Sequence, residues 1–221
     1  MTTTMRAPLD RRPVGLRELR PVRTLAGRLA RAGLRPNHVS LLGVAFSALS
    51  AACFLAVPSA EPTGRALLFL GGAGFIPLRG LCNLCDGLMA IEGGLRSRSG
   101  EIFNDLPDRF SDSLVLVSAG YALPATVWAP GLGWLAALLA ALTAYVRVLG
   151  AAVCAGQQFG GPMAKTHRMV VLALASTAAA GESLLGLPTR ALALGLTVIA
   201  VGCTVTIVRR TARIIAVLEA A

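Results

Sequence analysis

Residues 83–112 place carboxylate and amide side chains in a chain that otherwise consists largely of long apolar runs. Six of the eleven Asp and Glu residues fall in this stretch: Asp86, Glu92, Glu101, Asp105, Asp108 and Asp112. A carboxylate in hydrocarbon costs roughly 2.5–3.5 kcal/mol even on a lenient scale, so such residues usually mark a functional site. A bound cation or a polar substrate is the usual compensation, and oxygen ligands favour Mg²⁺, Mn²⁺ or Ca²⁺ over zinc.

Helical spacing predicts that these oxygens lie on two facing stripes. Asn83 and Asp86 are three residues apart at the end of one apolar run, so they share a helix face. Asn104, Asp108 and Asp112 follow at four-residue intervals at the start of the next run. Glycines between the two runs allow the backbone to turn and to approach a ligand closely: Gly87, Gly93, Gly94 and Gly100. We therefore expect two helices to direct oxygen ligands into one gap.

The elements that carry these residues are predicted to be membrane helices. The chain has 221 residues, of which 55% are hydrophobic and 14% charged, whereas soluble domains have about 25% charged residues. Apolar runs near 20 residues in length predict an all-α polytopic membrane protein with six spans. The expected spans are 38–57, 66–88, 103–123, 132–154, 168–187 and 191–210.

The domain organisation predicted from this pattern is one membrane domain over residues 1–221, because no polar linker separates the runs. It comprises a basic segment at 1–36, a six-helix bundle at 37–210 and a tail at 211–221. An apolar stripe within residues 14–34 predicts an amphipathic helix that lies in the membrane interface: Leu16, Leu19, Val22, Leu25 and Leu29. Asn37 or Ser40 is expected to cap the first span.

The basic residues predict orientation in a membrane, and we do not expect a nucleic-acid partner. The net charge is +10, and nine of the 21 basic residues lie between Arg6 and Arg35, before the first span. This bias follows the positive-inside rule and suits anionic membrane lipids. Both termini and the acidic stretch are therefore expected on the cytoplasmic side of the cell membrane.

A smaller set of cations lies near the later spans. Lys165 is the only lysine, which indicates a need for a compact ammonium, although a solvated loop lysine is the alternative. Arg147 lies in the middle of an apolar run, so it either faces a polar cavity or pairs with one of the acids. Together with Thr166 and Arg168, these residues are predicted to bind a phosphate on the acceptor or the lipid.

The motif residues resemble the CDP-alcohol phosphotransferase (CDP-alcohol phosphatidyltransferase) family. Its pattern is D-x-x-D-G-x-x-A-R, eight residues, and then G-x-x-x-D-x-x-x-D. Five residues match it at the correct spacing: Asp86, Gly87, Ala90, Gly100 and Asp108. The segments RPNHVSLLG at 35–43 and GPMAKTHRM at 161–169 are similar to those that open the family's first and fifth spans, so the resemblance covers nearly the whole chain.

This sequence departs from the family pattern at three positions. Asn83 and Asn104 stand where the family has Asp, and Ile91 stands where it has Arg. Fewer negative charges weaken a two-cation site by Coulomb's law. The nearby carboxylates that can supply the missing charge are Glu92, Asp105 and Asp112.

The resemblance implies a metal-dependent phosphatidyltransferase of phospholipid biosynthesis, in which an alcohol hydroxyl attacks a CDP-lipid, expected to be CDP-diacylglycerol, and CMP leaves. It implies Mg²⁺ or Mn²⁺, two ions, with Asp108 as the base. The implied metal ligands are Asn83, Asp86, Asn104 and Asp108, and Asp105 is a further candidate because its carboxylate neighbours Asn104. The implied nucleotide- and substrate-binding residues are Gly87, Ala90, Gly100, Arg147, Lys165, Thr166 and Arg168.

The acceptor is expected to be a small polar alcohol, with glycerol 3-phosphate, inositol phosphate, inositol, serine and glycerol as the alternatives. The basic residues favour a phosphorylated one. A homodimer is compatible with the family and with the Gly- and Ala-rich helices. The alternative function is a catalytically inactive homologue that binds lipid or nucleotide. A small transporter is disfavoured, because transport sites tend to lie near the midplane between repeats, whereas these acids crowd one end of the spans.

Overall fold

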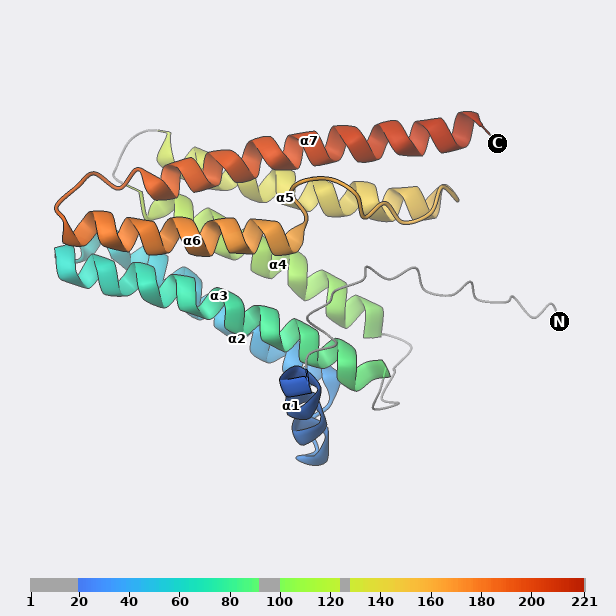
Figure 1. Ribbon diagram of the computed structural model, residues 1–221, viewed down its shortest axis with the longest axis horizontal. Coiled ribbons are helices and arrows are strands. Elements are labelled where there is room, and N and C mark those ends of the chain that lie inside the picture. Colours follow the sequence, from blue (N-terminus) through green and yellow to red (C-terminus); the bar gives the residue numbers. More distant parts are fainter. Residues whose placement is uncertain (1–19, 92–99, 124–127, 221) are drawn as a thin grey trace.

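The computed structural model describes residues 20–91, 100–123 and 128–220. Every element of regular secondary structure within these residues is a helix (Figure 1). The short helices are α1 (Arg20–Arg31) and the 3₁₀ turn η2 (Val57–Ser59). The long helices are α2 (Pro36–Ala56), α3 (Pro62–Ile91), α4 (Gly100–Tyr121), α5 (Ala129–Ala152), α6 (Lys165–Leu184) and α7 (Ala191–Glu219). The all-α class predicted from the sequence is confirmed for the described residues.

The six long helices pack in a closed ring. Helix α2 packs against α3 and α4, α3 packs against α6, α4 packs against α5, and α7 contacts both α5 and α6. In Figure 1, α2 and α3 lie on one side of the bundle and α5 and α7 on the other, with α6 between them. Segments far apart in the sequence are thereby brought to one interior.

The interior has an apolar half and a polar half, because most of the long helices change character along their length. The apolar half is filled by large buried side chains from α2, α3, α4, α6 and α7: Phe54, Phe69, Leu116, Leu172 and Leu196. One to three helical turns away from these apolar side chains, the residues of α3, α4 and α6 that point into the bundle are charged. The tightly packed half thus holds the helices in place around the charged half.

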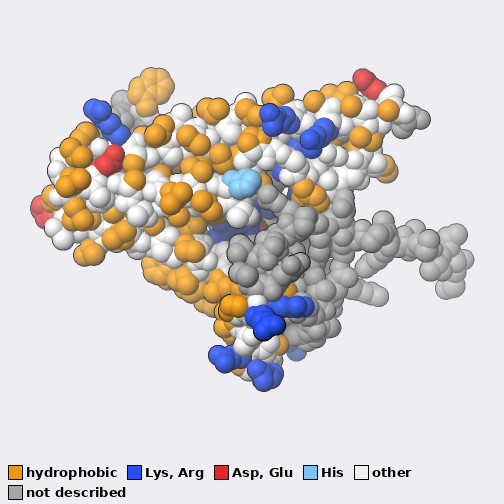
Figure 2. Space-filling model, in the orientation of Figure 1, with side chains coloured by type: hydrophobic (Ala, Val, Ile, Leu, Met, Phe, Trp, Pro, Cys, Tyr) orange, Lys and Arg blue, Asp and Glu red, His pale blue; other side chains and the backbone are white. Residues whose placement is uncertain are grey.

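In the part of the chain that the structure describes, four helical segments are long and apolar enough to cross a membrane: Pro36–Ser59, Pro62–Ala90, Pro130–Ala152 and Ala191–Glu219. Helices α4 and α6 fall short because they carry the charged residues of the polar half. Hydrophobic side chains cover much of the outer surface of the bundle (Figure 2), including Leu41, Leu67, Leu138, Leu174 and Leu194. These features indicate a helical membrane protein, and the count of six spans stays a prediction.

Helix α1 lies against the end of α3 (Figure 1). Ala26 is buried there, with Val22, Leu25 and Leu29 partly buried in the same apolar cluster. The exposed arginines of α1 form a basic patch in Figure 2. The predicted helix over 14–34 is thus seen from residue 20 onwards, Leu16 and Leu19 lie outside the described residues, and a position in the membrane interface stays a prediction.

The start of α2 and the end of α7 differ from the predictions. Helix α2 begins at Pro36, and the backbone N–H of Arg35 donates to Nδ1 of His38 at 3.5 Å, so the expected caps Asn37 and Ser40 are wrong. Proline suits the first helical position because the N–H that it lacks would have no partner there. Helix α7 continues to Glu219, past the predicted end of the span at 210.

Candidate functional site

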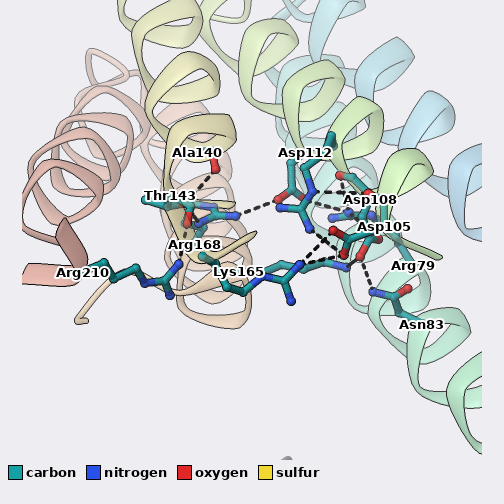
Figure 3. A network of polar contacts seen from close by, with 12 residues as sticks. Arg79, Asn83, Asp105, Asp108, Asp112, Ala140, Thr143, Lys165, Arg168 and Arg210 are labelled. Carbon is teal, nitrogen blue, oxygen red and sulfur yellow. Dashed lines mark hydrogen bonds and ion pairs between the residues drawn. The ribbon is translucent and has the colours of Figure 1, made fainter. Parts of the chain in front are cut away.

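Asp108 of α4 lies at the centre of the polar half and contacts three side chains. The amide nitrogen of Asn83 donates to its Oδ2 at 3.2 Å, and Nη2 of Arg79 donates to its Oδ1 at 3.3 Å. The Lys165 ammonium at the start of α6 also contacts Oδ2. Desolvation lowers the pKa of Lys165 from its ordinary value, and the Asp108 carboxylate works in the opposite direction. Helices α3, α4 and α6 therefore converge on this carboxylate (Figure 3).

One turn further along α4, Asp112 bridges two guanidinium groups. Its Oδ1 lies 2.6 Å from Nη2 of Arg79, and its Oδ2 accepts from Nη2 of Arg168 at 2.9 Å. The three side chains are nearly inaccessible, with 4% of Asp112, 4% of Arg79 and 2% of Arg168 exposed. Charges can be buried in this way only because each has an opposite charge and hydrogen-bonding partners.

Asp105, one turn before Asp108 on α4, makes a more exposed ion pair. Nη2 of Arg147 on α5 donates to both of its oxygens, at 3.0 and 2.8 Å. Arg109 approaches the same carboxylate at 3.4 Å within α4. The Arg147 guanidinium also lies 5.9 Å from the centre of the Phe159 ring. Arg147 therefore both faces a cavity and pairs with an acid, which combines the two alternatives predicted for it.

Asp86 is buried on α3 beside α2 and is only 3% exposed. The hydroxyl of Ser40 donates to its Oδ2 at 2.6 Å, whereas Oδ1 has no hydrogen-bond partner among the described residues. A buried carboxylate oxygen without a partner is costly unless a cation or a water satisfies it. Asp86 is therefore the one motif carboxylate with a free oxygen.

A cavity of about 570 Å³ opens beside Asp108 between α3, α4, α5 and α6. Its charged and polar wall includes Arg79, Asn83, Asp105, Asp108, Arg147, Lys165 and Thr166. Its apolar wall includes Ile76, Pro77, Leu81 and Leu84 of α3 and Val170 and Ala173 of α6. Pro77, Gly80 and Val170 are exposed on the outer surface, so this wall continues to the outside of the bundle. The dimensions and mixed character are those of a site for a small amphipathic ligand.

Helix α7 fixes the chain that leads into α6. Arg210 donates from Nη1 to the carbonyl of Thr143 at 2.5 Å and from Nε to the carbonyl of Gly160 at 2.8 Å. The hydroxyl of Thr206 accepts the Met163 N–H at 3.0 Å. Gly161 has φ +116°, and a Cβ there would lie 2.5 Å from Thr206, so only glycine fits. These contacts set the position from which Lys165 reaches Asp108.

Most of the predicted site residues lie around this one cavity: Asn83, Asp105, Asp108, Arg147, Lys165, Thr166 and Arg168. Asp86 lies on the α2 side of α3, and Gly87 and Ala90 follow it along that helix. Asn104 and Gly100 belong to α4, and their side-chain positions lie outside the described residues. The Arg168 guanidinium is enclosed by Asp112, Thr143 and the Met163 carbonyl, so its contacts hold the neighbouring side chains of the site in place.

Sequence reasoning missed Arg79, although it contacts both Asp108 and Asp112. The available signal was a lone arginine within the apolar run 66–88, which is the same signal that identified Arg147. It missed Arg210, which lies near the end of another apolar run, in the same way. Ser40 and Thr143 carry no comparable signal, because isolated hydroxyl residues are common in membrane helices.

The described residues do not fit the two-cation set that the family resemblance implies. Among them, no three His, Cys, Asp or Glu side chains are grouped closely enough to hold a metal ion. Both oxygens of Asp108 accept from nitrogen donors, and both oxygens of Asp105 accept from Arg147. Two buried carboxylate oxygens accept no hydrogen bond among the described residues, and of these Asp112 Oδ1 lies 2.6 Å from Arg79, whereas Asp86 Oδ1 has no ion pair there either.

The fold expected from the family resemblance is confirmed by solved structures. They are structures of phosphatidylinositol phosphate synthase from Mycobacterium tuberculosis. With CDP-DAG bound, that enzyme matches at TM-score 0.67 and 22% identity, over 89% of this chain and 94% of that chain. Its complex with manganese and citrate gives TM-score 0.68 and 23% identity, over 87% and 88% of the two chains. Its apo form gives 0.66 and 22%, over 86% and 94%.

No protein-family model matches the chain, and no curated protein sequence matches it. The solved structures therefore establish the fold of this chain and not its chemistry.

Proposed function

We propose that this protein is a membrane phosphatidyltransferase that transfers a phosphatidyl group from a CDP-lipid, expected to be CDP-diacylglycerol, to a small polar alcohol and releases CMP. The observation that carries this proposal is the cavity, which joins an apolar wall to a charged wall at the motif residue Asp108. A lipid-linked diphosphate has the same two-sided character. The similar fold of an enzyme solved with CDP-DAG bound supports the same donor.

The apolar wall between α3 and α6 suits the lipid part of the donor. Leu81 and Leu84 face the cavity from α3, and Val170 lies opposite on α6 at the outer surface. Acyl chains can therefore remain in the membrane while the diphosphate reaches the charged wall. The small residues Gly87, Ala90 and Gly100 are proposed to let the cytidine lie against the backbone.

The proposed reaction is an in-line displacement at phosphorus. The hydroxyl oxygen of the acceptor forms a bond to the phosphorus that carries the lipid, and the bond from that phosphorus to the oxygen of CMP breaks. CMP leaves with the electron pair, and Asp108 accepts the hydroxyl proton. A general base contributes about 10²–10⁴-fold to such a step.

Lys165 and Arg147 are proposed to neutralise the phosphates. The Lys165 ammonium lies against Asp108, where the hydroxyl must also lie, and Arg147 and Thr166 line the same cavity. Fixed positive charge in a dry site stabilises developing negative charge more strongly than in water. This cationic wall favours a phosphorylated acceptor. Arg168 is proposed to act through Asp112, because its guanidinium is enclosed.

The orientation follows from the basic residues. We propose that the chain lies in the cell membrane with both termini and the cavity on the cytoplasmic side, where the water-soluble acceptor and CMP exchange. The exposed arginines of α1 support this placement because they suit an anionic membrane surface.

The test is an acceptor screen that follows CMP release from CDP-diacylglycerol by purified protein. We expect release with at least one small alcohol, and a loss of about 10²-fold or more in Asp108→Asn. Glu219→Gln, at the exposed end of α7, removes a carboxylate far from the cavity and should leave the rate unchanged. Donor binding without CMP release from any acceptor would instead indicate the catalytically inactive homologue.

A further inference from the structure

Arg79 is a buried cation at the point where the motif carboxylates converge. Its Nη2 contacts Asp108 Oδ1 at 3.3 Å and Asp112 Oδ1 at 2.6 Å, and it also donates to the Asp108 carbonyl at 3.2 Å. It lines both the large cavity and a small cavity of about 10 Å³ beside Ser40, Asn83 and Asp108. Its guanidinium therefore lies between α3 and α4, in the gap into which these two helices were expected to direct oxygen ligands.

The charges around Asp108 are already balanced by the protein. Arg79 and Lys165 both contact its carboxylate, and the third contact is the Asn83 amide, which is neutral. Asp112 is likewise shared between Arg79 and Arg168. A divalent cation at Asp108 would have to approach two resident cations, which repel it. This pair of carboxylates is thus poorly suited to hold a metal ion.

Asp86 differs from Asp108 in its hydrogen-bond partners and in the charges that contact it. It is 3% exposed, the Ser40 hydroxyl donates to its Oδ2, and Oδ1 has no hydrogen-bond partner among the described residues. No guanidinium contacts it in that part of the chain. A hard cation is a natural partner for such an oxygen.

We propose that Arg79 stands in place of one of the two divalent cations that the family resemblance implies, so that this chain binds a single Mn²⁺ or Mg²⁺ at Asp86. The proposal rests on the proposed function for the identity of its ligand. In this arrangement Arg79 is a fixed positive charge in the wall of the large cavity, beside Asp108 and Asp112 (Figure 3). This arrangement explains why Asn83 stands where the family has Asp, because a carboxylate there would have no second metal ion to bind.

The test counts bound Mn²⁺ on purified protein by electron paramagnetic resonance of the free ion. We expect one Mn²⁺ per chain in the wild type and none in Asp86→Asn. Asn83→Asp alone should stay at one, because Arg79 and Lys165 remain. Arg79→Met combined with Asn83→Asp should bind two. Arg209→Met, which removes an exposed arginine of α7, should stay at one.

Two bound Mn²⁺ in the wild type, or none, would overturn the proposal. So would a monodisperse double variant that binds only one ion. If the double variant does not fold, the wild-type and Asn83→Asp counts decide, and two ions in Asn83→Asp would show that Arg79 does not exclude the second cation. A chain that binds one ion but releases no CMP contradicts the proposed function alone, whereas one that releases CMP with two ions bound contradicts this inference alone.

Discussion

Asp112→Asn tests whether the buried ion pairs hold α3, α4 and α6 together. The substitution keeps the shape of the side chain and removes its charge. Arg79 then keeps Asp108 as a partner, whereas Arg168 keeps neutral partners such as the Thr143 hydroxyl and the Met163 carbonyl. We expect the Arg168 charge, which is 2% exposed, to be left without an anion in the interior.

The size of the effect follows from burial. Removing one partner of a buried ion pair costs about 3–5 kcal/mol, because an uncompensated charge remains. For a chain of this size, about 1 kcal/mol lowers the melting temperature by roughly 2–4 °C, so a decrease of roughly 6–20 °C is expected. Asp105→Asn is the matched control on the same helix, since 43% of the Asp105 side chain is exposed and its pair with Arg147 is worth about 0–1 kcal/mol.

The assay heats both variants and the wild type in detergent and measures the fraction that remains monodisperse on size exclusion. Asp112→Asn should aggregate at a clearly lower temperature, and Asp105→Asn should follow the wild type within a few degrees. Equal shifts in the two variants would refute the reasoning, because burial would then not determine the cost of losing the charge.

Two further outcomes are expected. Lys165→Arg should lower CMP release at least tenfold, and Lys165→Met should lower it by about 10²-fold or more. The planar guanidinium of arginine does not replace a compact ammonium at Asp108 Oδ2, which also accepts from Asn83. A fully active Lys165→Arg would contradict this. Gly133→Ala should destabilise the fold by about 1–3 kcal/mol, because a Cβ there would lie 2.8 Å from the Leu116 carbonyl oxygen and 2.9 Å from Gly120 Cα. Gly131→Ala, where nothing lies within 4 Å, is its control and should not destabilise, and equal losses in thermal-stability assays would argue against close α4–α5 packing.

The helices could be predicted closely from apolar runs, because membrane helices leave a long and simple pattern. The predicted run at 132–154 became Ala129–Ala152, and the run at 168–187 became Lys165–Leu184. The cap of α2 could not be predicted, since a proline preceded by arginine begins the helix while Ser40 turns to Asp86. Caps depend on which neighbour a hydroxyl finds after packing.

The residues that belong to the site could be predicted better than the contacts that they make with one another. Asp108, Lys165 and Arg147 were expected near one cavity and lie there. The pairing of Arg168 with Asp112 depends on the order of helices around the ring, which no local spacing encodes. Arg79 carried the same signal as Arg147, but its partners could not be predicted because they come from α4, 29 residues further along the chain in the case of Asp108.

The charged residues of α4, which make it less apolar than the four candidate membrane-spanning segments, also affect how the protein inserts into the membrane. Presented alone to a bilayer, α4 carries Asp108 and Asp112 without their partners and Asp105 with Arg109 alone, and each isolated acid costs roughly 2.5–3.5 kcal/mol. Arg79 precedes α4 in synthesis and can meet it at once, whereas Lys165 and Arg168 emerge later with α6. We therefore expect α4 to remain incompletely inserted until α6 has been made, so that the insertion of α6 also completes the ion pairs of the site.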